Sequence, residues 1–235
     1  MRINKFLAQS GLGSRRKVED LILAGKVKVN GKVIEQLAYQ INEKKDKVFV
    51  DGKEIKLVND FVYLKLNKPK GYICSAKDEK GRKTIYDLIP DAKGRLFSIG
   101  RLDYNTEGLI LITNDGNLAY KLTHPTYEIE KEYIVVIEGK IKESECAVLR
   151  AGVIESGVRM PEAKVDVIEV LKDKTRLSVR IDEGQNRQIR RMFDCIGKTI
   201  ILLKRVRIGE IKLGGLVRGK YKELNNEELL YLSKI

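Results

Sequence analysis

Residues 100–112 read Gly-Arg-Leu-Asp-Tyr-Asn-Thr-Glu-Gly-Leu-Ile-Leu-Ile. The first nine form a loop bounded by glycines, with the carboxylate of Asp103 two residues after the guanidinium of Arg101. The apolar run 109–112 has the composition of a buried strand. A carboxylate beside a buried strand and a fixed cation stays ionised, which suits a group that attacks a carbon or abstracts a proton. A turn aspartate beside a surface arginine is the alternative that these residues alone leave open.

The chain of 235 residues carries 46 Lys and Arg against 33 Asp and Glu, a formal net charge of +13. Such an excess attracts a polyanion, and nucleic acid is the commonest polyanion inside cells. A basic enzyme without such a partner is the alternative. The three cysteines are far apart and form no CxxC, so we expect neither a disulfide framework nor a zinc finger.

The start of the chain lacks the long apolar stretch of a signal peptide. No apolar run approaches the roughly 20 residues that a helix needs to cross a bilayer. We therefore expect a soluble cytoplasmic protein without membrane contact.

Residues 1–58 have the pattern of a small α/β domain. Apolar residues predict a first helix over 3–10, and Ser14 is a good N-cap for a second helix that Gly25 ends. Alternating residues around Asn30-Gly31 predict one hairpin, and Asp51-Gly52 predicts another. Residues 58–60 are expected to form a linker to the rest of the chain.

The remainder, 61–235, is predicted to be one α+β domain. Its strands are expected to be long and mostly antiparallel, with a few helices between them. The predicted strands cover 61–66, 109–113, 133–138, 163–170, 176–181 and 199–208. The predicted helices cover 117–123, 143–150, 186–196 and 226–234.

The second helix of the first domain opens with Arg15, Arg16 and Lys17. Cations in this turn oppose the helix dipole and cost roughly 0.3–1 kcal/mol each. The free backbone N–H groups of the same turn attract anions. With Lys26 and Lys28 nearby, the three cations predict a phosphate-binding surface. A solvated basic face is the alternative.

Two further features are candidates for a binding site. If a helix begins at residue 186, Arg187, Arg190 and Arg191 share one of its faces. One such arginine would pair with a loop carboxylate and hold it ionised, whereas a basic surface helix is the alternative. Tyr133 lies early in a predicted strand, where its ring can stack on a base or simply join the core.

Four segments together resemble, in order and spacing, the motifs of the pseudouridine synthase family. Residues 100–108 and the following Leu-Ile-Leu-Ile-Thr-Asn-Asp-Gly are similar to its catalytic motif. Lys131-x-Tyr133-x-Val135 resembles its tyrosine motif, 186–190 its third motif, and 67–71 the motif that opens its catalytic domain.

The resemblance extends over nearly the whole chain. Residues 1–58 are similar to the small RNA-binding domain first recognised in a ribosomal protein, the S-four type. Residues 122–131 are most similar to the large-subunit synthase B branch, although many members of that branch have an acidic residue in place of Asn105.

The resemblance implies a fold and a reaction. The fold is a mixed, mostly antiparallel sheet with helices against it and a central cleft in 61–235. The reaction is isomerisation of a uridine to pseudouridine in ribosomal RNA, with 23S favoured over 16S. Neither a redox cofactor nor a metal is implied. The expected partner of a monomeric enzyme is ribosomal RNA or a ribosome-assembly intermediate.

The resemblance also assigns roles to residues. Asp103 is the implied catalytic carboxylate, paired with Arg190, and Tyr133 would stack on the target base. Arg101 would fill the gap left when the uridine is flipped from its stack, and Arg187 would contact RNA.

Three other functions remain open at this point. One is a non-catalytic RNA-binding or assembly factor that keeps the fold, and another is a small-subunit synthase. The joint presence of Asp103, Tyr133 and Arg190 favours an enzyme. A carboxylate-based glycosidase needs a second acidic group at a defined separation, and Glu107 has no support for that role.

Overall fold

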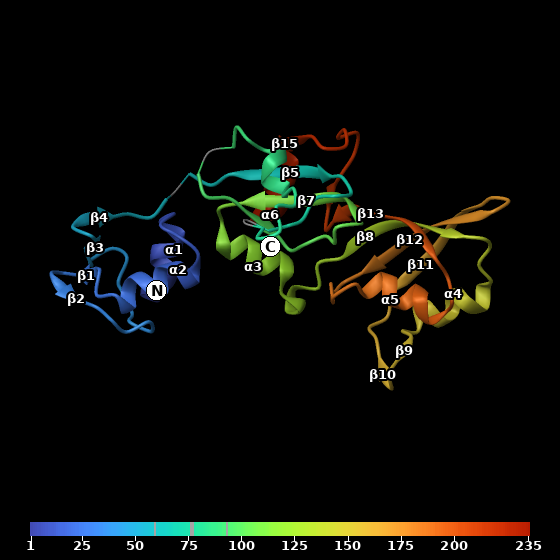
Figure 1. The fold of residues 1–235 in the computed structure, drawn as a ribbon, viewed down its shortest axis with the longest axis horizontal. Coiled ribbons are helices and arrows are strands. Elements are labelled where there is room, and N and C mark those ends of the chain that lie inside the picture. Colours follow the sequence, from blue (N-terminus) through green and yellow to red (C-terminus); the bar gives the residue numbers. More distant parts are fainter. Residues whose placement is uncertain (59, 76–77, 93) are drawn as a thin grey trace. The chain divides into compact units, whose positions relative to one another are not determined.

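The computed structural model describes residues 1–58, 60–75, 78–92 and 94–235. The chain forms two compact units (Figure 1). The first contains residues 1–62 with the short segments 92–96 and 114–116, and the second contains the rest. The predicted linker includes Asn59, which lies outside the described residues. No helix in the described part of the chain is long and apolar enough to cross a membrane.

The first unit packs two helices against a four-stranded antiparallel sheet in the order β2-β1-β3-β4. Ser14 caps the second helix as predicted, since its Oγ accepts from the Lys17 N–H at 3.1 Å. Asn30 and Gly31 have φ values of 50° and 84°, which the predicted hairpin requires. The elements are α1 (Ile3–Gln9), α2 (Arg15–Leu23), β1 (Val27–Val29), β2 (Lys32–Val33), β3 (Val48–Val50) and β4 (Lys53–Ile55).

The second unit is built on a nine-stranded sheet whose main order is β11-β12-β8-β13-β7-β5-β15. Strand β13 pairs with β7 in parallel, and its pairs with β8 and β14 are antiparallel. The predicted mixed, mostly antiparallel sheet is confirmed. The strands are β5 (Tyr63–Lys68), β6 (Phe97–Ile99), β7 (Glu107–Thr113), β8 (Lys131–Glu138), β11 (Lys164–Val170), β12 (Lys174–Ile181), β13 (Ile200–Ile208), β14 (Ile211–Lys212) and β15 (Tyr221–Glu223).

Helices complete two apolar cores of the second unit. α4 (Glu143–Arg150) and α5 (Gln188–Cys195) share a core with β8 and β12. α3 (Gly116–Thr123) and α6 (Asn226–Ser233) share a core with β7 and β14. Because β7 and β13 pair with each other, the sheet runs continuously from one core to the other (Figure 1).

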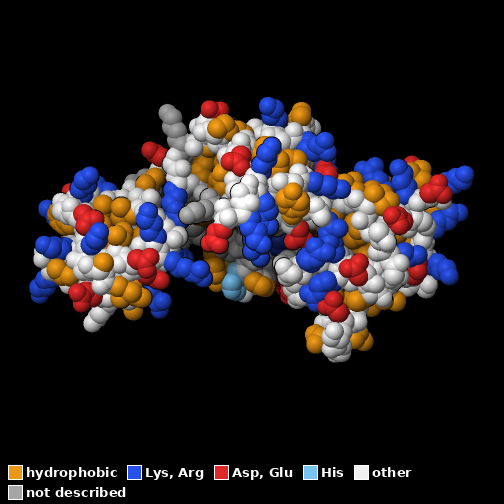
Figure 2. All heavy atoms as spheres, in the orientation of Figure 1, with side chains coloured by type: hydrophobic (Ala, Val, Ile, Leu, Met, Phe, Trp, Pro, Cys, Tyr) orange, Lys and Arg blue, Asp and Glu red, His pale blue; other side chains and the backbone are white. Residues whose placement is uncertain are grey.

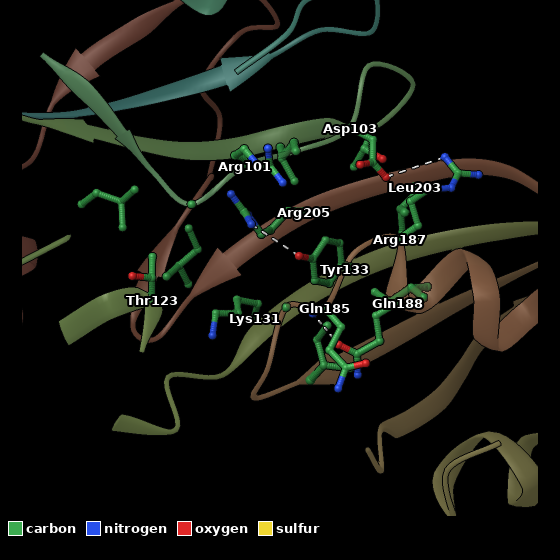
Figure 3. A pocket seen from close by; sticks show the side chains of 18 of the residues that line it. Arg101, Asp103, Thr123, Lys131, Tyr133, Gln185, Arg187, Gln188, Leu203 and Arg205 are labelled. Carbon is green, nitrogen blue, oxygen red and sulfur yellow. Dashed lines mark hydrogen bonds and ion pairs between the residues drawn. The ribbon is translucent and has the colours of Figure 1, made fainter. Parts of the chain in front are cut away.

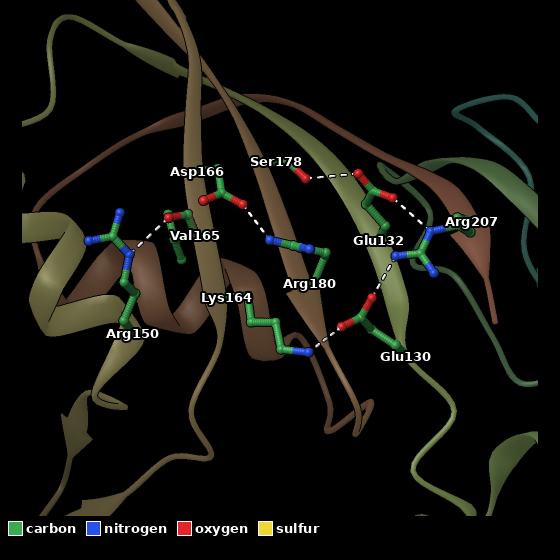
Figure 4. A network of polar contacts seen from close by, with 9 residues as sticks. All are labelled: Glu130, Glu132, Arg150, Lys164, Val165, Asp166, Ser178, Arg180 and Arg207. Atoms are coloured by element: carbon green, nitrogen blue, oxygen red, sulfur yellow. Dashed lines mark hydrogen bonds and ion pairs between the residues drawn. The ribbon is translucent and has the colours of Figure 1, made fainter. Parts of the chain in front are cut away.

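A network of ion pairs joins β8, β11 and β13 (Figure 4). Arg207 Nε donates to Glu132 Oε2 at 2.8 Å, and its Nη2 donates to Glu130 Oε1 at 2.5 Å. Hydrogen bonds from Lys164 and Arg207 lower the pKa of Glu130, and one from Arg207 lowers that of Glu132. The side chains of Arg207, Glu130 and Glu132 are only partly exposed, so these pairs help to fix β8 beside β13. The Lys164 side chain is exposed, and its pair with Glu130 contributes about 0–1 kcal/mol.

Several short elements are not predicted by the sequence pattern. They are β6, β14, β15, the hairpin of β9 (Ile154–Glu155) and β10 (Val158–Arg159), and the 3-10 helices η1 (Ile85–Leu88) and η2 (Pro125–Tyr127). The strands are two or three residues long, which is too short for alternation to be visible. Tertiary contacts decide where such segments pair.

Most predicted strands and helices begin or end one or two residues from the predicted position, and two of these shifts affect residues of the site. The strand predicted over 61–66 is β5, which begins and ends two residues later because Asn67 and Lys68 pair with Leu109 and Gly108 of β7. The helix predicted from residue 186 begins at Gln188. Arg187 is its N-cap and lies in the left-handed region, with φ of 50°.

Candidate active site

One cavity in the second unit collects the motif residues (Figure 3). Its volume is about 180 Å³. Pockets for drug-sized ligands usually measure about 300–1,000 Å³, so this cavity suits a single flat ring better than a large cofactor. The wall combines residues 99–103 with parts of β8, β13 and the start of α5, including Arg101, Asp103, Tyr133, Arg187, Leu203 and Arg205.

Lys68 holds the loop that carries Asp103. Its side chain is 0% exposed, and its Nζ donates to three backbone carbonyls, those of Pro69 at 3.1 Å, Asp103 at 3.0 Å and Thr106 at 2.9 Å. Burial lowers the pKa of Lys68, and the nearby carboxylates of Asp103 and Glu107 partly oppose that shift. The lysine thus fixes the backbone of the loop on both sides of the turn.

Gly108 explains why the motif ends in glycine. It pairs with Arg205 where β7 meets β13, and its φ is +105°. A Cβ at this position would lie 2.1 Å from the Arg205 carbonyl oxygen. Only glycine permits so close an approach of the two strands, and this approach brings the Asp103 loop to β13.

Asp103 faces a different arginine from the one predicted. Its carboxylate is 36% exposed and its Oδ2 lies 4.0 Å from Nη1 of Arg187. Among the described residues no ion pair joins it to Arg190, so this structure does not contain the predicted pairing. The physical reason is the left-handed N-cap, which removes Arg187 from the helix and turns its side chain toward the loop.

Arg190 instead supports the loop backbone. Its Nη2 donates to the Asn105 carbonyl at 3.0 Å and to Thr106 Oγ1 at 3.2 Å. Burial is the main cause that lowers its pKa; Arg187 adds to the shift and Asp103 opposes it. Arg191 points elsewhere, and its Nε donates to Glu155 Oε2 at 2.7 Å. The prediction that the three arginines share one helix face is therefore wrong.

Tyr133 lies on the inner face of β8 and is 7% exposed. Its hydroxyl oxygen accepts from Nη1 of Arg205 at 3.4 Å, and its ring centroid lies 6.0 Å from Cζ of that arginine. Figure 3 shows the tyrosine between Arg205 and Gln188 at the cavity wall. Its ring is a suitable surface for a planar ligand.

Two further cations reach the cavity. Arg101 is exposed and lines its edge. Lys131 also lines it, and its Nζ donates to the Asp182 carbonyl at 2.6 Å. Burial, and then the charge of Arg205, lower the pKa of Lys131. In the described part of the chain, no group of three or more His, Cys, Asp or Glu side chains is placed to hold a metal ion.

The predicted phosphate-binding residues lie in the first unit. Arg15, Arg16 and Lys17 are exposed in the first turn of α2, whose N-terminus contains no acidic residue. Lys28 is exposed on β1, and Lys26 lies 3.9 Å from Asp51 across an exposed ion pair. Figure 2 shows Lys and Arg side chains spread over both units.

The sequence pattern assigned no role to Lys68, Arg205 or Leu203. A signal for Arg205 was present, because alternation along 200–208 places it on the same face as Leu203, and a charged residue on the inner face of a strand is unusual. Lys68 stands at the end of an apolar strand, but its three carbonyl partners are visible only in the structure.

The chain matches two family models. The model of the RNA pseudouridylate synthase family covers residues 62–194, and the S4 domain model covers residues 1–48. A crystal structure of a pseudouridylate synthase superposes with a TM-score of 0.70 and 29% identity over 99% of each chain.

Two relatives are similar over almost their full length. A protein of Aquifex aeolicus, named only as an RNA pseudouridine synthase, is 42% identical over 236 residues, which are 100% of this chain and 94% of the relative. Ribosomal large subunit pseudouridine synthase B of Bacillus subtilis is 41% identical over 230 residues, 97% and 93% of the two chains. Together with the cavity geometry, these matches place the chain in the RNA pseudouridine synthase family.

Proposed function

We propose that this protein isomerises a uridine of large-subunit ribosomal RNA, with Asp103 as its catalytic carboxylate. The observation that carries the proposal is Asp103 on a loop clamped by Lys68, at the edge of a ring-sized cavity lined by Tyr133. The similarity to a large-subunit synthase of Bacillus subtilis supports the choice of RNA.

The reaction needs a uridine outside its base stack, because its glycosidic bond is otherwise occluded. The bond between N1 and C1′ breaks, the uracil turns over, and a bond forms between C5 and C1′. Asp103 either adds to the ribose at C1′ or removes its 2′ proton, and both roles require an ionised carboxylate. Tyr133 stacks on the base, and Arg101 fills the vacated space in the RNA.

A pseudouridine map of ribosomal RNA tests this proposal. Cells with and without the gene are compared by chemical mapping of 23S and 16S RNA. We expect one 23S site to lose its pseudouridine in the deletion strain and to regain it with the parent gene. A loss confined to 16S RNA would overturn the choice of subunit, and unchanged maps would overturn the proposed activity on ribosomal RNA.

Arg190 and Arg191 form a matched pair of test positions. We expect Arg190→Leu to slow single-turnover conversion about 10²-fold, because a displacement of the reacting group by about 1 Å can cost that much. Arg191→Leu should have a much smaller effect, since that side chain pairs with Glu155 outside the cavity. Equal rates for the two variants would contradict the positioning role of Arg190.

The first turn of α2 is the proposed RNA-docking surface. Changing Arg15, Arg16 and Lys17 to Gln should weaken RNA binding. The plot of the logarithm of the binding constant against the logarithm of the salt concentration should become less steep, by roughly 0.7–0.9 for each phosphate that is no longer neutralised. The variant should melt no lower than the parent, because cations at a helix N-terminus are unfavourable. Conversion at saturating enzyme should remain near the parent rate.

A charge-matched control uses Lys44, Lys45 and Lys47, which are exposed in the same unit. Changing these three to Gln alters net charge equally but leaves the helix terminus intact. Identical salt slopes for both triple variants would show that total charge, and not this turn, attracts the RNA.

We further infer that the enzyme acts as a monomer in the cytoplasm. The three cysteines, Cys74, Cys146 and Cys195, are all unpaired thiols, which suits a reducing compartment. Sedimentation at micromolar concentration should give a single species of 26.8 kDa, and a concentration-dependent dimer would contradict this inference.

A further inference from the structure

Arg205 is a buried cation at the wall of the cavity. It lies in β13, is 5% exposed, and faces inward like Leu203 two residues before it. Figure 3 shows its guanidinium directed toward Tyr133. No carboxylate lies within 4 Å of it in the described residues. A buried charge without an ion-pair partner is unfavourable and therefore marks a position where a ligand can use it.

The hydrogen bonds of Arg205 leave one nitrogen unused. Its Nε donates to the Leu109 carbonyl at 2.8 Å, and its Nη1 donates to the Tyr133 hydroxyl at 3.4 Å. Its Nη2 is buried and has no hydrogen-bond partner among the described residues. A guanidinium carries five N–H donors and no acceptor. Because Arg205 lines the cavity, the unpaired donors of Nη2 could be satisfied by an acceptor oxygen of a bound ligand.

A uracil ring has the matching acceptors. Its carbonyl oxygens O2 and O4 lie on either side of N3. When the N1–C1′ bond breaks, its electron pair stays with the ring, and the negative charge spreads over N1, O2 and O4. A fixed cation that donates to one of these oxygens stabilises that charge as it develops, as donors of an oxyanion hole do.

The geometry of the isomerisation fits a stationary donor. Turning the uracil over about the axis through N3 and C6 exchanges N1 with C5 and O2 with O4. A donor on the wall thus meets a carbonyl oxygen both before and after the turn. The C5–C1′ bond then forms, the C5 proton leaves, and N1 takes up a proton, so the product is an isomer of the substrate.

We propose that Arg205 donates a hydrogen bond from Nη2 to a carbonyl oxygen of the flipped uracil and stabilises the uracil anion. This inference rests on the proposed function. The proposed role belongs to Arg205 and not to Lys131, which also lines the cavity, because the Lys131 ammonium already donates to the Asp182 carbonyl. The role does not belong to Arg187 or Arg190 either, because Arg187 lies near the Asp103 carboxylate and Arg190 donates to the backbone of the loop.

The test combines variants with thio-substituted substrates. The probe is a 23S RNA fragment around the mapped uridine, made by splinted ligation with uridine, 2-thiouridine or 4-thiouridine at the target. Single-turnover conversion is followed by nuclease digestion and chromatography. Arg205→Met should slow conversion of the uridine substrate about 10²–10³-fold, the loss typical of removing one oxyanion donor. A slower rate alone does not identify the contact. The contact is identified by the thio effect, which is the ratio of the rate with uridine to the rate with 2-thiouridine or 4-thiouridine.

Sulfur accepts hydrogen bonds poorly, so replacing the contacted oxygen should slow the parent enzyme more than the Arg205→Met variant. Groups in contact usually couple by about 2- to 150-fold. The intrinsic effect of sulfur on the leaving group cancels in this comparison. Lys131→Met is the matched control, and it should retain the full thio effect of the parent. If Arg205→Met does not fold, Arg205→Lys keeps the charge, lacks Nη2 and should also lose the coupling.

Equal thio effects at both carbonyls in the parent and in the folded Arg205 variant would overturn the proposal. A parent enzyme that fails to convert the unsubstituted 23S fragment would instead overturn the proposed substrate. The two failures are therefore distinguishable in one set of measurements.

Discussion

Asp103→Asn is expected to fold normally, to bind RNA and to form no pseudouridine above background. An amide is neither a nucleophile nor a base, so conversion should fall at least about 10⁴-fold, the order of loss when such a group is removed from an enzyme. The loop should stay in place because Lys68 binds the backbone carbonyl of Asp103 and not its carboxylate. The measurements are single-turnover conversion, RNA affinity and thermal unfolding.

The stability of the Asn variant separates chemistry from folding. The carboxylate is partly exposed, and its ion pair with Arg187 is long, so the free energy of unfolding should change by about 0.5 kcal/mol or less. Asp173→Asn, an exposed carboxylate of the β11–β12 turn, is the control for loss of one charge. Near-parental turnover in Asp103→Asn would reject the proposed mechanism.

Lys68→Met should damage both stability and activity. The side chain is fully buried, and its loss leaves the carbonyls of Pro69, Asp103 and Thr106 without this donor. An unsatisfied buried acceptor costs about 1–3 kcal/mol. Removing the buried charge recovers some desolvation, so we expect a net loss of about 3 kcal/mol. Displacement of the loop should slow single-turnover conversion about 10²-fold.

The neighbouring lysine provides the comparison. Lys70 is exposed, and its Nζ donates to the Ile201 carbonyl at 3.3 Å. Lys70→Met should therefore have the same unfolding midpoint in denaturant as the parent, and its single-turnover rate of conversion should equal that of the parent. If Lys68→Met were as stable and as active as Lys70→Met, the clamp on the Asp103 loop would have no role.

Local rules were sufficient for much of the fold. Ser14 predicts the start of α2, and Asn30-Gly31 predicts the first hairpin, because capping and turn geometry depend on neighbours only a few residues away. Alternation or apolar runs predict the long strands for the same reason. The order and spacing of the motifs were sufficient to identify the family and to single out Asp103 and Tyr133.

The partners of the site residues could not be derived in this way. A helix of regular spacing predicts Arg187, Arg190 and Arg191 on one face, but Arg187 lies in the left-handed N-cap outside the helix, and Arg191 pairs with Glu155 away from the loop. The carboxylate of Asp103 consequently meets Arg187, and Arg190 binds the loop backbone. A change in one backbone angle redirects a long side chain, and no pattern in residues 186–191 predicts the left-handed angle at Arg187.

By itself the sequence determined the reaction class, the α+β architecture and the candidate site residues. Only the tertiary structure decided how those residues are held. Lys68 reaches the Asp103 carbonyl across 35 positions of the chain, and Arg205 lines the cavity because Gly108 lets β7 approach β13. The physical reason is that caps, turns and alternation act between near neighbours, whereas a buried donor finds its acceptor through the register of strands distant in sequence.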